Sequence, residues 1–315
     1  MTLPAFLQQA PPTVAVDLAP ERVAVVRVDR RGATAAIASH GVEALPAGAI
    51  TGALSAPNMA DVSVVAAAIS RALVTAGARA TRVSLVVPDT VARVSLVRFE
   101  ALPAKASDFD ELIRWQVKKT TPFPLDEAVV SYTPGLAVPG AHEFIVTVAR
   151  RDVVGQYEEA CDLAGAHAGI VDLATFNVVN AVLASAGPVA GDWLLVHAAP
   201  SYVSLAVLRD GHLIFYRTRG DEAEGSVADL VHQTAMYYVD RLKGQRFGRV
   251  LLSGGSSVAG ADHLRRELSD RLGLEVEAVD PFHAASPSAR LGASPSLADA
   301  LAPGIGILLR EKAAS

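Results

Sequence analysis

The sequence predicts an α/β protein made of two similar halves. Short, nearly unbroken apolar runs such as residues 83–87 and 250–252 are typical of strands buried in a parallel sheet. Residues 58–76 instead place their apolar side chains at helical spacing. Residues 17–23 also align without a gap to residues 197–203, each with an Ala-Pro turn between two strands. This self-similarity indicates a duplicated domain, and we expect the two halves to face each other across a cleft.

Composition narrows the classes of function. The chain has 315 residues, which is enough for two domains with cores of their own. The hydrophobic fraction is 51%, but no uncharged apolar run reaches the roughly 18 to 20 residues of a membrane helix, so we expect a soluble, cytoplasmic protein. A formal charge of -5 provides no basic surface for nucleic acid. With one cysteine, and histidines that never occur at zinc-ligand spacing, no metal site is predicted.

The first part of the chain alternates strands with a helix. Valine-rich residues predict strands at 14–17 and 23–28, and a turn at 29–32 leads to a third strand at 33–37. A helix is expected over residues 58–76, because its apolar residues share one face and Gly77 ends it. Residues 83–87 follow as a buried strand.

Residues 93–163 are predicted to form an inserted unit with a small core of its own. A helix over residues 107–119 begins with capping-type residues and carboxylates and ends with two lysines, which suits the helix dipole. Its inward stripe is predicted to be Phe109, Leu112, Ile113, Gln116 and Val117. The Thr-Thr-Pro-Phe-Pro segment then leads the chain away from the helix. Strands at 128–133 and 143–148 and a helix at 152–164 complete the unit.

The second half begins after a helix at residues 175–185 and the boundary signal Gly187-Pro188. Strands are expected at 193–196, 202–208 and 213–218, and Asp210-Gly211 makes a hairpin between the last two. Ser226 with Asp229 begins a helix that runs to about residue 242.

A glycine turn follows the strand at 250–253. Gly254 and Gly255 allow close approach of a flat or charged group, and amides at the start of the next helix can donate to it. The sequence therefore predicts a ligand site at this turn, with the alternative that the two glycines only turn the chain from the strand into the helix. Helices over residues 261–272 and 296–310 complete the chain.

These landmarks resemble the actin-like ATPases, the superfamily of actin, Hsp70, FtsA and the sugar kinases. In that superfamily each half begins with a phosphate-binding hairpin, and a later strand-Gly-Gly turn holds the adenosine. Residues 17–24, 197–204 and 253–257 occupy those three places in order. The chain is most similar to the PilM-like assembly proteins of type IV pili, and the segments that carry this likeness are Ile113-Arg114-Trp115-Gln116, Thr121-Pro122-Phe123-Pro124-Leu125-Asp126-Glu127, Val129-Val130-Ser131-Tyr132 and Leu251-Leu252-Ser253-Gly254-Gly255.

The resemblance implies an actin-like, ribonuclease H-like duplicated fold of two facing lobes with a small inserted α+β subdomain. The first lobe would comprise residues 1–92, 164–190 and 297–315. The inserted subdomain would be residues 93–163, and the second lobe residues 191–220 and 248–296. Residues 221–247 would form a small helical insertion in the second lobe.

The two phosphate-binding hairpins depart from the superfamily pattern of Asp-x-Gly followed by hydroxyl residues and a lysine. In the first hairpin Asp17 is kept, but Ala19 replaces the glycine and Pro20 and Glu21 fill the turn. The second hairpin has His197 where a second carboxylate is expected to organise a hydrated magnesium ion. Proline donates no N–H and a glutamate repels polyphosphate, so ATP, and Mg²⁺ with it, is expected to bind weakly or not at all.

If a nucleotide binds, the resemblance implies that five residues contact it: Asp17, Arg22, Gly254, Gly255 and Ser256. Arg22 offsets part of the local negative charge. Adenine binding at the glycine turn without tight phosphate binding is an intermediate possibility.

The resemblance favours a scaffold over an enzyme. Such a scaffold would hold the cytoplasmic tail of a PilN-like inner-membrane protein in a groove between the core and residues 93–163, and would couple it to the pilus motor ATPase. The protein would then be cytoplasmic and peripheral to the inner membrane. Partner contacts are expected at Arg114, Trp115, Phe123 and Val130, although Trp115 and Phe123 are also plausible core residues.

Two alternatives stay open. The first is an active ATPase or small-molecule kinase on the same fold, which needs an acidic base and an intact phosphate cradle. The second is the cytoplasmic part of a type II secretion protein, which would continue into a membrane helix.

Overall fold

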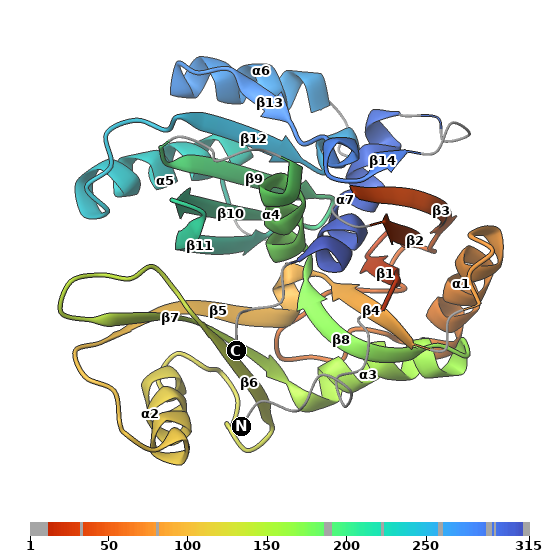
Figure 1. The fold of residues 1–315 in the computed structure, drawn as a ribbon, viewed down its shortest axis with the longest axis horizontal. Coiled ribbons are helices and arrows are strands. Elements are labelled where there is room, and N and C mark those ends of the chain that lie inside the picture. The colour runs from red at the N-terminus through yellow and green to blue at the C-terminus, as the bar shows by residue number, and fades with distance from the viewer. Residues whose placement is uncertain are drawn as a thin grey trace.

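The computed structural model describes residues 12–31, 34–79, 82–185, 191–221, 224–257, 261–287, 292 and 294–310. Three sheets with helices between and around them make up this part of the chain (Figure 1). The predicted boundary at Gly187-Pro188 lies outside the described residues. No helix in the described ranges is both long and apolar enough to cross a membrane.

The first sheet has six strands in the order β14-β3-β2-β1-β4-β8. Strands β1 to β3 form an antiparallel meander, and β4 and β8 extend the sheet parallel to β1. Their bounds are β1 Val14–Ala19, β2 Arg22–Arg31, β3 Thr34–Ala44, β4 Arg82–Val87, β8 His167–Leu173 and β14 Ser286–Pro287.

The second sheet repeats this arrangement in the order β11-β10-β9-β12-β13. Strands β9 to β11 form the antiparallel meander, and β12 and β13 are the parallel extension. Their bounds are β9 Trp193–Ala199, β10 Tyr202–Arg209, β11 His212–Gly220, β12 Arg249–Ser253 and β13 Val276–Ala278.

The registers confirm the predicted duplication. Asp17 pairs with Ala24 in the first hairpin, and 180 residues later His197 pairs with Ser204 in the second. Even the irregularity in the meander recurs at this spacing, between residues 27 and 28 of the first lobe and 207 and 208 of the second. An amide after the third strand also binds the carbonyl of each turn, Leu45 to Glu21 and Asp221 to Ser201.

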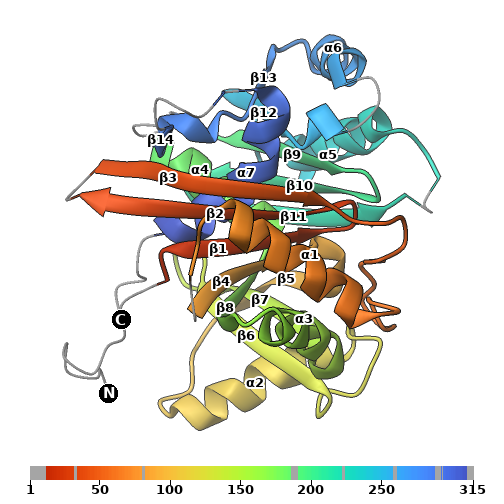
Figure 2. The same cartoon turned by 90° about the vertical axis from the view of Figure 1, so that its right-hand side faces the viewer.

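Helices cover both sheets in layers (Figures 1 and 2). On the outer face of the first sheet, side chains of α1 (Val62–Thr75) and α3 (Arg151–Leu163) share a core with Val14, Val16 and Leu18. The outer face of the second sheet carries α5 (Val227–Arg241) and α6 (Ala261–Leu272). Helices α4 (Ala174–Ser185) and α7 (Pro295–Leu309) lie between the sheets, α4 on the second and α7 on the first.

The two central helices pack unusually closely. A Cβ at Gly306 of α7 would lie 1.6 Å from the carbonyl oxygen of Asn177 in α4, so only glycine permits this crossing. The helices thus form a common spine against which both lobes pack.

The third sheet belongs to the inserted unit and has the order β5-β7-β6. Its strands are β5 (Ala92–Phe99), β6 (Ala128–Pro134) and β7 (His142–Arg150), and α2 (Ala106–Lys118) packs on one face. Four aromatic rings join helix to sheet: Phe99, Phe109, Tyr132 and Phe144.

Some expectations for the inserted unit are wrong. Gln116 is exposed rather than part of the inward stripe. Helix α2 begins after Lys105, which makes no side-chain cap, and Ser107 bonds the Asp108 carboxylate instead. The sequence pattern also did not predict β5.

Other differences lie in the two lobes. Helix α1 begins at Val62, because the Asp61 side chain caps it by accepting from the Ser63 amide. Strand β8 was not predicted, and neither were the short strands β13 and β14. The short 3-10 helices are η2 (Asp89–Val91), η3 (Gly255–Ser257) and η4 (Pro281–His283). The residue ranges predicted for the two lobes, the inserted subdomain and the helical insertion stay predictions.

Candidate functional site

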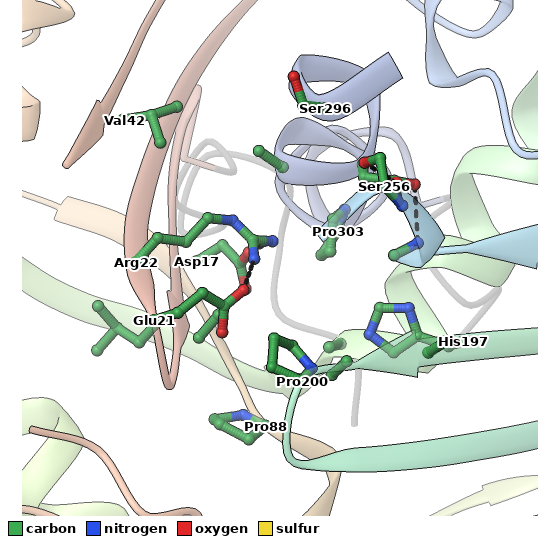
Figure 3. Close-up of a pocket in the computed structure, with 18 of the residues that line it drawn as sticks. Asp17, Glu21, Arg22, Val42, Pro88, His197, Pro200, Ser256, Ser296 and Pro303 are labelled. Atoms are coloured by element: carbon green, nitrogen blue, oxygen red, sulfur yellow. Dashed lines mark hydrogen bonds and ion pairs between the residues drawn. The ribbon is translucent and has the colours of Figure 1, made fainter. Parts of the chain in front are cut away.

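A cavity of about 460 Å³ lies between the lobes, where the two duplicated hairpin turns face each other below α7 (Figure 3). The first hairpin contributes residues 17–19, 21 and 22, and the second contributes residues 197–200 and 202. Gly254 and Ser256 of the glycine turn and the N-terminal half of α7 complete the wall. Most of the remaining lining is alanine, proline and leucine, so the cavity has few charged groups.

The first hairpin turn holds an ion-pair network at the place where phosphate contacts were expected. Arg22 Nη2 lies 3.2 Å from Asp17 Oδ2, and Arg22 Nη1 donates to Glu21 Oε1. Burial raises the pKa of Asp17 to about 7, although the Arg22 guanidinium opposes this shift. The one cation at this turn is therefore shared between two carboxyl groups, and little of its charge is left for a phosphate.

In the second hairpin, the neutral side chain of His197 lies where a carboxylate was expected to organise a hydrated magnesium ion. His197 is 5% exposed, its Nδ1 has no hydrogen-bond partner among the described residues, and its Nε2 lies 3.5 Å from the Tyr202 hydroxyl. Burial lowers the pKa of His197, although the carboxylates of Asp89 and Asp299 oppose the shift. Pro200 in the adjacent turn supplies no N–H.

The glycine turn is already bound by a carboxylate of the chain itself. Asp299 on α7 accepts the amides of Gly254 and Ser256 at 2.7 and 2.9 Å, and also the Ser256 hydroxyl. Gly254 has φ 78, and a Cβ there would lie 2.4 Å from the Ala198 carbonyl oxygen, so the turn is pressed against the end of β9. The amides predicted to receive a ligand thus tie α7 to the second lobe.

A second carboxylate joins the lobes below the cavity. Asp89 is fully buried and accepts the Thr175 amide at 3.0 Å, the Thr175 hydroxyl and the Ser204 hydroxyl, the last at 2.7 Å. Ser204 in turn lies 2.9 Å from Thr218 Oγ1. This network links η2 of the first lobe and the start of α4 to β10 and β11 of the second.

These residues do not fit a magnesium-nucleotide. Both turns contain proline, the amides of Gly254 and Ser256 are engaged, and the described residues contain no group of three or more His, Cys, Asp or Glu that could hold a metal. A polyphosphate would meet Asp17, Glu21 and Asp299 with one shared arginine.

The structure brings four of the five predicted nucleotide contacts together. Asp17, Arg22, Gly254 and Ser256 line the cavity, whereas Gly255 does not. That these residues contact a nucleotide stays a prediction. Sequence reasoning missed Asp89 and Asp299, and the one available signal for Asp89 was an acidic residue two positions after the end of a buried strand.

The four predicted partner contacts lie on the inserted unit, away from the cavity. Arg114 and Trp115 are on the exposed face of α2, where Trp115 is 65% exposed and Arg114 donates to the Leu125 carbonyl. Phe123 and Val130 are half-buried against the core of the inserted unit. Their role in partner binding stays a prediction.

A second hollow, which we call the groove, has a volume of about 730 Å³. Its walls are the loop at residues 51–54, residues 90 and 92–94 around the start of β5, residue 201 of the second hairpin turn, and residues 216–218, 220 and 221 of β11 and its end. Among the described strands β5 pairs only with β7, and β11 only with β10, so each presents an unpaired edge. No residue predicted for partner binding lies in the groove.

Comparisons with known proteins agree on one fold. The sequence model for the type IV pilus assembly protein PilM matches residues 15–225, more than half of the chain. A chain of a PilM-PilN type IV pilus biogenesis complex is 18% identical, with a TM-score of 0.81 over 94% of this chain and 97% of that one. The ethanolamine utilization protein EutJ from Carboxydothermus hydrogenoformans is 12% identical, with a TM-score of 0.51 over 96% and 90%. The search of curated proteins found no match. The predicted actin-like fold is confirmed.

Proposed function

The chain belongs to the family of type IV pilus assembly protein PilM, and we propose that it is a scaffold that holds the tail of a PilN-like inner-membrane protein in the groove. The observation that carries this proposal is the groove between two unpaired strand edges, in a chain whose structural relative comes from a PilM-PilN complex. In this role the protein is cytoplasmic and reaches the membrane through its partner.

The groove has the chemistry that an extended peptide needs. Unpaired backbone groups on β5 and β11 can bond the main chain of a peptide laid between them, and side-chain pockets then give specificity. The hollow also lies where the inserted unit meets both lobes, so a bound tail would contact all three sheets or their loops.

The wall at residues 51–54 is held rigidly in place. Asn58 is 1% exposed, accepts the Ala53 amide at 3.0 Å and the Tyr157 hydroxyl at 2.8 Å, and donates to the carbonyls of Ala53 and Ala56. Arg150 also bonds the Ser55 carbonyl. Because this wall is already ordered, less conformational entropy is lost when the peptide binds, which suits a site that is always ready to bind its partner.

The interlobe cavity supports a scaffold rather than an ATPase or kinase. Its hairpins lack the phosphate donors of such enzymes, and Asp89, which follows β4, is fully buried and saturated with donors rather than available as a base. We propose that the lobes are held in one arrangement by Asp89 and Asp299 and that nucleotide does not drive partner capture.

A pair of variants tests the proposal. A fluorescent peptide of the PilN-like tail is titrated into the full chain, followed by anisotropy. Thr51→Trp, which fills the groove, is expected to weaken binding at least tenfold, whereas Val74→Glu on the exposed face of α1 is expected to leave it unchanged. Equal melting temperatures check that both variants fold. If Trp115→Glu weakens binding and Thr51→Trp does not, the tail docks on α2 and the groove assignment is wrong.

A further inference from the structure

We infer that the groove recognises a carboxylate, carried by an aspartate or glutamate of the extended tail. The inference rests on the proposed function and adds the chemistry of the contact. Its basis is a pair of guanidinium groups, Arg93 from β5 and Arg217 from β11, one on each wall.

Both arginines lack an internal counter-charge. Arg93 and Arg217 are exposed, and neither forms an ion pair or hydrogen bond with any described residue. Two other strand arginines do have a carboxylate partner: Arg209 donates to Asp192 and Arg249 donates to Glu277, each through more than one bond. Among the described residues that line the groove, Asp221 is the only acidic one, so these residues carry two positive charges and one negative charge.

A carboxylate matches this donor set better than other side chains. It is acceptor-only and can take two parallel bonds from a guanidinium. A lysine or arginine would be repelled by the two guanidiniums, and an apolar side chain would offer them no acceptor. With strand edges on either side, the carboxylate belongs on a residue of a chain that runs through the groove.

The experiment uses the full chain and synthetic peptides of the PilN-like tail. In one set each aspartate or glutamate of the tail is changed singly to its amide. In the other set the chain carries Arg93→Gln, Arg217→Gln or both, with Arg98→Gln as control, since Arg98 is exposed on the same strand outside the groove. One tail acid is expected to account for an affinity loss of about tenfold or more, matched by the double arginine variant and not by Arg98→Gln.

A charge swap makes the assignment specific. Arg217→Glu should abolish binding of the natural tail, and the tail in which the critical acid becomes lysine should recover it in part. A tail that binds equally well without any acidic residue, or to the double arginine variant, overturns the inference while leaving the groove proposal intact. A natural tail that does not bind the unmodified chain instead overturns the proposed function.

Discussion

Removing the Asp89 carboxylate is expected to destabilise the chain more than any change to a surface acid. In Asp89→Ala, the amide and hydroxyl of Thr175 lose their acceptor inside the protein, whereas Ser204 keeps Thr218. Two buried donors left unbonded cost about 2 kcal/mol each, or about 4 kcal/mol together. At roughly 2–4 °C per kcal/mol for chains of this order of size, the melting temperature should fall by about 10 °C.

The assay is thermal and urea unfolding of the full chain, with two comparison variants. Asp89→Asn keeps one acceptor oxygen and should lose about half as much stability. Asp152→Ala removes a carboxylate that is 57% exposed and paired with Arg150, and should cost less than about 1 kcal/mol. The argument is refuted if Asp89→Ala melts within 1 °C of the unmodified chain, because Asp89 would then not hold the lobes together.

Three further predictions concern the cavity and the inserted unit. Calorimetry should detect no tight Mg-ATP binding by the unmodified chain, and tight binding would contradict the interpretation of the cavity. A triple variant with Ala19→Gly, Ala199→Gly and His197→Asp should bind ATP more tightly than any of the three single variants, because the backbone amides and the carboxylate act as one site. Because burial raises the pKa of Asp17 to about 7, the folded state keeps a proton that the unfolded state releases above about pH 4. The free energy of unfolding should therefore decline from pH 4 to 7 by up to about 4 kcal/mol relative to Asp17→Asn, and parallel pH profiles would contradict the shift. Trp115→Ala should change the free energy of unfolding by less than about 0.5 kcal/mol in urea, since the side chain is 65% exposed, and a larger loss would show hidden packing.

Local patterns predicted much of the fold. The two hairpins were found because their registers depend on short strands and Ala-Pro turns that lie close together in sequence. The start of α5 was found for a similar reason, since Ser226 and Asp229 form a capping box within one turn. Interactions between residues that are close in sequence can therefore be predicted without knowledge of the tertiary structure.

Strand β5 was missed because it does not alternate cleanly. Val97 and Phe99 face the core of the inserted unit, whereas Val94 and Leu96 pack against cores of the two lobes. A strand whose two faces pack against different parts of the protein has apolar residues at both odd and even positions. It therefore lacks the alternation of apolar and polar residues by which a strand is predicted.

The principal features of the cavity could not be predicted, because they join distant parts of the chain. Asp299 binds amides more than 40 residues away, and Asp89 binds Ser204 at a separation of 115. In sequence the glycine turn looked free to bind a ligand, and only the packing of α7 shows that its amides are engaged. The groove likewise depends on two strand edges that meet only in the folded protein.

The most direct test of the central claim is a crystal structure of the full chain bound to the tail peptide of the PilN-like protein, grown with Mg-ATP present. We expect the peptide to lie extended in the groove between β5 and β11, and the interlobe cavity to contain no nucleotide. Peptide bound instead on α2 or the free edge of β6, or Mg-ATP bound between Asp17 and Gly254, would contradict the account.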